Sequence, residues 1–198
     1  MLRVDLRVSQ IQSVSMKNLT LDWIDFCRIS NLSSPPKTGA GVYVWGFTIN
    51  NEFVPYYVGI AEDIVFRMFE HLNAIIGGKY TIYHKDSLVN FIAFKGVKES
   101  VDQKTGKLYT PDWPKSYYHF LANRKTLQLH IDFMVDAFTF SFALIDKESI
   151  SGADLKEIEK ICIRQIGIDL LANTRGGHSD KFILEHGGNN TVCKIMRS

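Results

Sequence analysis

Two tyrosines, an arginine and a histidine follow one another within a short stretch of the chain. They are Tyr43, Tyr57, Arg67 and His71. A tyrosine hydroxyl and an imidazole can both pass protons, and a guanidinium presents a planar fork of donors that matches phosphate oxygens. Residue types of this kind suit a reaction in which a proton moves beside an oxyanion.

The sequence around these residues predicts a strand, a tight turn and a second strand. Alternating aromatic residues indicate the first strand at residues 42–49. Asn50 and Asn51 form a plausible turn because asparagine tolerates positive φ. The returning strand is expected at residues 54–60, where Pro55 marks an edge or an irregularity.

A helix is expected next, beginning near Glu62 or Asp63, since acidic residues suit the positive end of a helix. Arg67 and His71 are four residues apart and would lie together at the margin of its apolar face. Gly77 and the glycine after it would end the helix. The apolar face comprises Ile64, Val65, Met68, Phe69 and Leu72.

This stretch resembles the GIY-YIG nuclease family. Gly41-Val42-Tyr43 stands where that family has GIY, and Tyr57-Val58-Gly59 stands where it has YIG. Arg67 follows Tyr57 by 67 − 57 = 10 residues and precedes His71 by four, and both spacings agree with the family pattern. Two features depart from it: valine replaces isoleucine in both triplets, and the 13 residues between Tyr43 and Tyr57 make a slightly longer hairpin.

A second part of the resemblance lies on a helix expected at residues 154–165. Glu159 lies on the flank of its buried face, about 60° from the centre. The family has an acidic residue on this helix and then an asparagine in an N-x-x-G-G type segment, which Asn173 matches here, although 173 − 159 = 14 is a longer separation than usual. The acid is therefore assigned to Glu159, with Glu157, which points nearly opposite the buried face, as the alternative.

The resemblance implies an α+β fold with a three-stranded antiparallel sheet flanked by helices, the third strand being residues 138–145. We expect one domain over residues 1–198, with an N-terminal extension at 1–40 and an insertion at about 78–136 before the third strand. The extension is expected to pack on the domain rather than form a substrate or dimer surface. Further expected elements are a strand at 2–8, helices at 19–29 and 113–135, and a loop at 98–114. Residues 80–97 could form either a strand or a helix.

The activity implied by the resemblance is a metal-dependent DNA endonuclease, restriction-type or phage-associated, with Mg²⁺ or Mn²⁺ as cofactor. Glu159 would be the protein ligand of the metal, and one carboxylate suits Mg²⁺, which keeps several waters. Arg67 would pair with the scissile phosphate. Asn173 would orient neighbouring groups.

Proton transfer falls to the tyrosines and the histidine in this interpretation. Tyr43 would be the general base, which requires Arg67 and the metal to favour its phenolate, because an unperturbed tyrosine has a pKa near 10. Tyr57 would hydrogen-bond the water or the base, and His71 would assist proton transfer or contact phosphate. All of these side chains, with Glu159, are expected to converge on one concave surface.

Taken singly, each of these residues has an ordinary structural explanation. The alternative is a non-catalytic nucleic-acid-binding or interaction protein that retains the fold. The net charge of +2 permits nucleic-acid binding without arguing for it.

Three scattered cysteines without C-x-x-C spacing indicate reduced thiols in a cytoplasmic protein without a zinc site. No apolar run is long enough to span a membrane, and no P-loop or HExxH motif occurs. A homodimer is the usual arrangement for cutting both strands.

The inserted stretch at residues 101–125 is basic and aromatic. Five cations against two acids give +5 − 2 = +3. Basic charge can follow phosphates and aromatic rings can stack on bases; equally, the rings could cover the core while the lysines are solvated. The cations are Lys104, Lys107, Lys115, Arg124 and Lys125, and the interleaved rings are Tyr109, Trp113, Tyr117, Tyr118 and His119.

Replacing Lys104, Lys107 and Lys115 together by alanine tests the nucleic-acid interpretation of this stretch. Fewer counterions would be released on binding, so the affinity for DNA should fall. The slope of log affinity against log salt concentration should become shallower by up to about three. Fluorescence anisotropy across a salt series measures both effects. Unchanged affinity at every salt concentration would instead indicate that the lysines are solvated and that the aromatic rings of this stretch cover the core.

Overall fold

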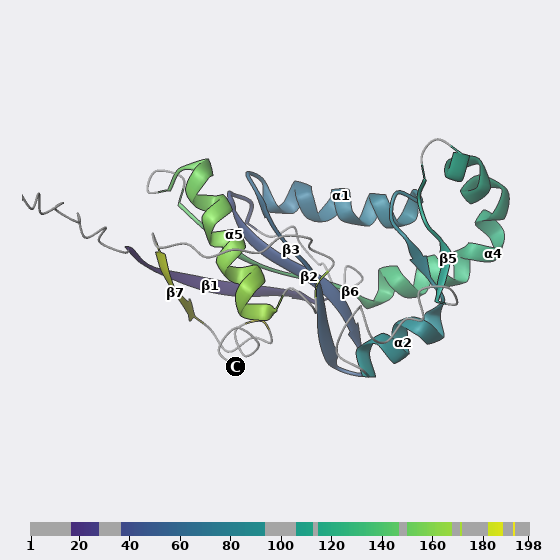
Figure 1. Ribbon diagram of the computed structural model, residues 1–198, viewed down its shortest axis with the longest axis horizontal. Helices are drawn as coiled ribbons and strands as arrows, with labels where there is room; N and C mark the ends of the chain where they lie inside the picture. Colours follow the sequence, from purple (N-terminus) through teal and green to yellow (C-terminus); the bar gives the residue numbers. More distant parts are fainter. Residues whose placement is uncertain are drawn as a thin grey trace, which may run out of the picture.

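A computed structural model of the chain describes residues 17–27, 37–93, 106–112, 115–146, 150–167, 171, 182–187 and 192. These residues form an α+β fold with a five-stranded sheet and a small two-stranded one (Figure 1). The large sheet contains β1 (Lys17–Cys27), β2 (Gly41–Ile49), β3 (Glu52–Ala61), β6 (Phe138–Leu144) and β7 (Phe182–Gly187). The small sheet contains β4 (Ile82–Tyr83) and β5 (Lys107–Tyr109). The described helices are α1 (Ile64–Ile76), α2 (Lys85–Ala93), α4 (Lys115–Ala137) and α5 (Gly152–Ile166).

The large sheet is mixed, with the strand order β3-β2-β6-β1-β7. The three strands expected from the sequence are β2, β3 and β6; they are neighbours, and β2 pairs antiparallel with both others. β1 extends the sheet antiparallel to β6, and β7 then pairs parallel to β1. The sheet is therefore larger than the three-stranded, purely antiparallel sheet that was expected, and it contains a parallel pair of strands.

The helix expected at residues 19–29 is wrong, because this segment belongs to strand β1. Leu21 and Trp23 are buried while Asp22 and Ile24 are exposed, which is the two-residue period of a strand. β1 also lies between β6 and β7, so its backbone groups find partners on both sides.

A two-residue turn joins β2 to β3, as expected. Asn50 and Asn51 have φ values of 53° and 64°, the left-handed region that asparagine tolerates.

The irregularity expected at Pro55 is confirmed as a bulge in the hairpin. Trp45 pairs with Tyr57 and Gly46 with Pro55, so Tyr56 is an extra residue in β3. As a result, two consecutive tyrosines, Tyr56 and Tyr57, pack against the same core.

Helix α1 begins where the acidic residues predicted. Asp63 caps it and accepts a hydrogen bond from the backbone N–H of Phe66 at 2.9 Å, while Thr38 donates to the same carboxylate. Gly77 caps the other end, and Gly78 follows with φ of 67°. The predicted apolar face is only partly buried, since the Phe69 side chain is 45% exposed.

Two hydrophobic cores lie on the two faces of the sheet. Tyr43, Trp45 and Phe47 of β2 face the core shared with α1 and α4. The intervening Val42 and Val44 face the core shared with α5, because successive strand residues point to opposite faces. Figure 1 shows α5 and β7 toward one end of the molecule and α4 with β5 toward the other.

The insertion carries more structure than the sequence predicted. The helix expected at 113–135 is confirmed as α4, whereas the expected loop at 98–114 contains strand β5. In the ambiguous segment at 80–97, the described residues 80–93 form β4 and then α2. The strand expected at 2–8 lies outside the described residues. Among the helices described, none is both long and apolar enough to cross a membrane.

Gly46→Ala should destabilise the fold because its Cβ would overlap the backbone carbonyl oxygen of Val54 across the bulge. We expect a loss of about 1–3 kcal/mol, the usual range for overpacking, measured as a lower midpoint of urea unfolding. Gly152→Ala is the matched control, since nothing lies within 4 Å of a Cβ there. Equal midpoints for the two variants would contradict the close approach at Gly46.

Candidate functional site

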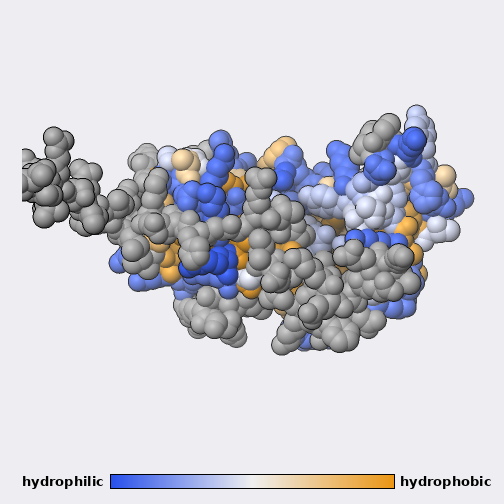
Figure 2. All heavy atoms as spheres, viewed as in Figure 1, coloured by the Kyte–Doolittle hydropathy of each residue, from blue (hydrophilic) through white to orange (hydrophobic). Residues whose placement is uncertain are grey.

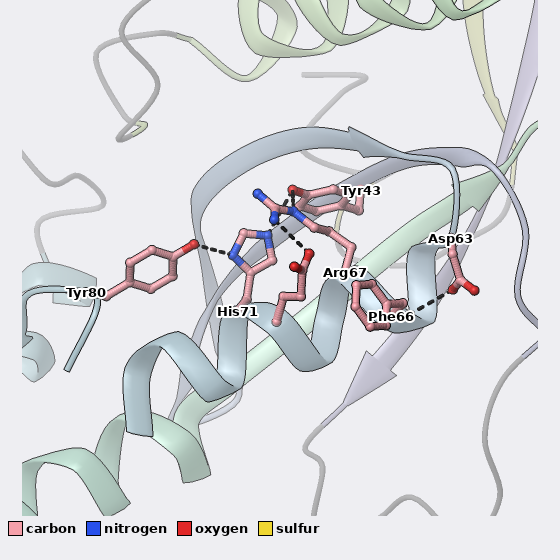
Figure 3. Close-up of polar contacts among 7 residues, drawn as sticks. Tyr43, Asp63, Phe66, Arg67, His71 and Tyr80 are labelled. Atoms are coloured by element: carbon pink, nitrogen blue, oxygen red, sulfur yellow. Dashed lines mark hydrogen bonds and ion pairs between the residues drawn. The ribbon is translucent and has the colours of Figure 1, made fainter. Parts of the chain in front are cut away.

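Four side chains form one hydrogen-bonded chain between the sheet and α1 (Figure 3). Arg67 donates its Nε–H to the hydroxyl oxygen of Tyr43 at 3.3 Å. That hydroxyl also lies 2.9 Å from Nε2 of His71, whose Nδ1 lies 2.7 Å from the hydroxyl of Tyr80. Tyr43 comes from β2, Arg67 and His71 come from consecutive turns of α1, and Tyr80 comes from the segment that follows this helix.

Gly59 makes room for the Tyr43 hydroxyl. A Cβ at this position would overlap the hydroxyl and the adjoining ring carbon of Tyr43, and would lie 2.9 Å from the ring of Tyr57. The ring of Tyr43 therefore passes over a strand residue that has no side chain. This close approach is a physical reason for glycine after the second tyrosine of the hairpin.

Burial sets the protonation states at the centre of the chain. Tyr43 is 1% exposed and His71 is 2% exposed. Burial raises the pKa of Tyr43 above its ordinary value, and the hydrogen bond from Arg67 offsets only part of this effect. Burial, with a smaller contribution from the charge of Arg67, lowers the pKa of His71 to about 3. At neutral pH the pair is therefore a neutral phenol beside a neutral imidazole.

A cavity of about 300 Å³ opens beside this chain. It is lined by Tyr57, Arg67, His71 and Tyr80, and by Lys79, which directly precedes Tyr80 in the segment after α1. The remaining lining residues are Trp45, Tyr56, Thr81 and Pro111. Two cations and several hydroxyl groups therefore surround a space open to solvent.

Two polar groups at the cavity bear on what it can bind. The buried indole N–H of Trp45 has no hydrogen-bond partner within the described part of the chain. The Nη1 of Arg67 pairs with Glu70 at 2.9 Å, and the Arg67 side chain is 38% exposed. An anion entering from solvent could compete with Glu70 for this exposed guanidinium.

Glu159 lies on α5, which packs on the opposite face of the sheet from the ring of Tyr43. Its side chain is partly buried, as expected for the flank of the helix, and burial raises its pKa. Burial also raises the pKa of Tyr57, and the negative charge of Glu159 raises it further. Glu159 is therefore coupled electrostatically to Tyr57, but the hydrogen-bonded chain comprises Tyr43, Arg67, His71 and Tyr80.

Glu157, the alternative acid, is less exposed than the sequence predicted. Its carboxylate pairs with Lys160 at 2.8 Å, and its side chain is 24% exposed. Asn173 lies outside the described residues. In the part of the chain that the structure describes, no three His, Cys, Asp or Glu side chains are grouped as a metal site.

The basic residues of the insertion that the structure describes do not form a single row. Arg124 and Lys125 are exposed on α4 and line the same surface hollow. Lys115 is exposed at the start of α4, nine residues before Arg124 and so roughly half a turn around the helix from it. Lys107 on β5 is partly exposed, and Lys104 lies outside the described residues. Figure 2 shows mostly hydrophilic side chains over the end of the molecule that contains α4.

The aromatic residues of the insertion divide between the two interpretations. Tyr109 is 4% exposed and packs in the core, and its hydroxyl donates to the carbonyl of Gly78 at 2.9 Å. Tyr118 is 77% exposed and available for stacking. His119 stacks beside Tyr109, and Trp113 lies outside the described residues.

Sequence reasoning missed Tyr80 and Glu70. Glu70 lies three residues after Arg67, a helical spacing at which opposite charges pair, so the signal was present. Tyr80 had no such signal, because its contact with His71 depends on how the chain turns after α1.

No protein-family model, curated protein or solved structure matches the chain.

His71→Gln should change the pH dependence of stability. The pKa of His71 in the folded state lies below the ordinary value of 6.5, so the unfolded chain binds a proton that the folded chain does not. The stability that neutral His71 contributes is thus present above pH 6.5 and is lost as pH falls toward 3, with a slope approaching about 1.4 kcal/mol per pH unit.

Urea unfolding followed by circular dichroism from pH 7.5 to pH 4 measures this effect. The wild type should lose stability faster than His71→Gln as pH falls, so the two curves should approach each other. Parallel curves would show that His71 does not titrate in this way.

Proposed function

We propose that this protein is a metal-dependent DNA endonuclease of the GIY-YIG type that hydrolyses phosphodiester bonds. The observation that carries the proposal is the Tyr43 hydroxyl, held by Arg67 on one side and His71 on the other, beside a cavity of about 300 Å³. Arg67 and His71 line this space together with three tyrosines, Tyr56, Tyr57 and Tyr80. Guanidinium, imidazole and phenol groups are those that phosphoryl chemistry uses for charge stabilisation and proton transfer.

Arg67 is the phosphate-binding residue in this proposal. Its guanidinium is partly exposed and lines the cavity, and planar guanidinium groups match phosphate oxygens. A bound phosphate would compete with Glu70 for Nη1. Lys79 adds a second cation at the same cavity, which favours an anionic substrate.

Tyr43 is the general base in this proposal, and it must first lose its own proton. Burial disfavours the phenolate, so the resting hydroxyl is protonated. His71 Nε2 lies 2.9 Å from the hydroxyl and is the nitrogen positioned to accept that proton. Burial disfavours both the phenolate and the imidazolium, so the transfer requires the positive charges of Arg67 and the metal ion to favour the phenolate. Tyr57 lines the same cavity and would hydrogen-bond the attacking water.

Glu159 is the residue that would hold Mg²⁺ or Mn²⁺. A partly buried carboxylate whose pKa is raised by burial fits a cation, because a nearby positive charge offsets the cost of burying the negative one. The metal ion would supply Lewis-acid stabilisation of the phosphate. Asn173 is proposed to orient neighbouring groups.

Strands β2, β3 and β6 with α1 are proposed to correspond to the family's sheet and first helix, and β1 and β7 are additions to it. The proposed partner is DNA, contacted also by Lys104, Lys107, Lys115, Arg124 and Lys125. A cytoplasmic homodimer acting on both strands completes the proposal.

The competing function is a nucleic-acid-binding protein that does not cut. The position of α5 favours it, because this helix packs its buried side chains on the opposite face of the sheet from Tyr43. The hydrogen-bonded chain of Tyr43, Arg67, His71 and Tyr80 does not include Glu159. A protein of this kind would keep Arg67, Lys79 and the exposed cations of α4 as its binding surface.

Glu159→Ala separates the two functions. If Glu159 holds the metal, the rate of cleavage in this variant should fall by at least about 100-fold. A loss of this size is typical when an enzyme loses one group that stabilises the charge of the transition state. DNA binding should persist or tighten slightly, since a negative charge near the phosphate is removed. Cleavage of duplex, branched and single-stranded DNA, and of RNA, is measured with and without Mg²⁺, and binding is measured by anisotropy in EDTA.

Glu157→Ala is the matched control from the same helix. It should cut DNA about as well as wild type, because its carboxylate pairs with Lys160. Loss of cleavage in Glu157→Ala alone would reassign the acid to Glu157. A wild type that cuts none of these substrates with Mg²⁺ or Mn²⁺ would favour the binding function instead.

A further inference from the structure

Tyr80 is held firmly beside His71 although it belongs to no motif. The backbone N–H groups of Lys79 and Tyr80 both donate to the carbonyl of Ala74, at 2.7 and 3.2 Å, which folds the chain back onto the end of α1. Gly78 makes this turn possible with φ of 67°, and the ring of Phe120 packs against it so closely that a Cβ would overlap the ring. The Tyr80 hydroxyl therefore has a defined position, 2.7 Å from His71 Nδ1.

The proton on His71 can be placed by counting donors and acceptors around Tyr43. Arg67 Nε always carries a hydrogen, so the Tyr43 oxygen accepts from it. The hydroxyl proton of Tyr43 then needs an acceptor. Among the described residues the hydroxyl has one other partner, Nε2 of His71, and Tyr43 is 1% exposed.

Only one form of neutral His71 satisfies this requirement. If Nε2 carried the proton, the imidazole and Arg67 would both donate to Tyr43, and the buried hydroxyl proton would have no acceptor, which is costly. If Nδ1 carries the proton, Nε2 accepts from Tyr43 and Nδ1 donates to Tyr80. The Tyr80 hydroxyl can then direct its own proton into the cavity that it lines.

We propose that Tyr80 is a positioning residue that holds His71 in the Nδ1–H tautomer, so that Nε2 stays free to take the phenol proton of Tyr43. The hydrogen bond made by one ring nitrogen sets which nitrogen carries the proton. The catalytic part of this inference rests on the proposed function, whereas the tautomer is a property of the free protein.

The step that Tyr80 supports is a single proton transfer. The bond from Tyr43 Oη to its hydrogen breaks and a bond from that hydrogen to His71 Nε2 forms. The phenolate keeps the hydrogen bond from Arg67, and the imidazolium keeps its Nδ1–H on the Tyr80 oxygen. That second hydrogen bond stabilises the imidazolium, because hydrogen bonds from charged donors are stronger than those from neutral ones.

Nitrogen-15 NMR of protein labelled at histidine tests the tautomer without any substrate. In the wild type at pH 7.5 the His71 signals should show hydrogen on Nδ1 and none on Nε2. Tyr80→Phe should move the signals toward the Nε2–H form. Tyr83→Phe is the matched control, since its hydroxyl lies 3.3 Å from that of Tyr56 and is not part of the hydrogen-bonded chain through His71. This variant should leave the His71 signals unchanged.

Cleavage kinetics test the role in the reaction. Tyr80→Phe should lower kcat about tenfold, the value of roughly one hydrogen bond, leave KM unchanged, and shift the pH profile of kcat. Tyr83→Phe should match the wild type in all three.

The outcomes separate this inference from the proposed function. A wild-type spectrum with hydrogen on Nε2, or a Tyr80→Phe spectrum identical to wild type, overturns the tautomer assignment even if the enzyme cuts DNA. The expected spectra together with a wild type that cuts nothing would support the assignment and overturn the nuclease. An unshifted pH profile in Tyr80→Phe would show that the tautomer does not govern the reaction.

Discussion

The buried hydroxyl of Tyr43 is the constraint on which the rest of the site depends. A buried hydroxyl is costly unless it is hydrogen-bonded, so the surrounding elements must bring partners to it. Helix α1 does so by placing Arg67 and His71 on consecutive turns, and β3 does so by leaving the space over Gly59 empty. The same contacts that stabilise the hairpin against α1 thus assemble the reactive groups.

Local signals made much of this arrangement predictable. The Asn50-Asn51 turn, the Asp63 cap and the irregularity at Pro55 each depend on residues close together in sequence, and all three are present. The buried face of α5 was also predicted, because Leu155, Ile158, Ile161, Cys162 and Ile166 repeat with the helical period and are all buried.

What could not be predicted depends on contacts between distant segments. The sequence of residues 19–29 predicts a helix, whereas the strand β1 that forms there depends on β6 and β7, which lie more than a hundred residues away in the chain. The side of the sheet that α5 covers is likewise set by tertiary packing. Tyr80 reaches His71 only because Gly78 turns the chain and Phe120 of α4 packs on that turn.

The bulge in β3 also affects how the molecule meets other chains. Among the described strands, β3 is at an edge of the large sheet. An edge strand with a regular row of N–H and C=O groups invites pairing with a further strand. Here Pro55 lacks an N–H and the extra residue, Tyr56, interrupts the register at the same point. This irregular edge therefore disfavours the addition of a further strand at this point.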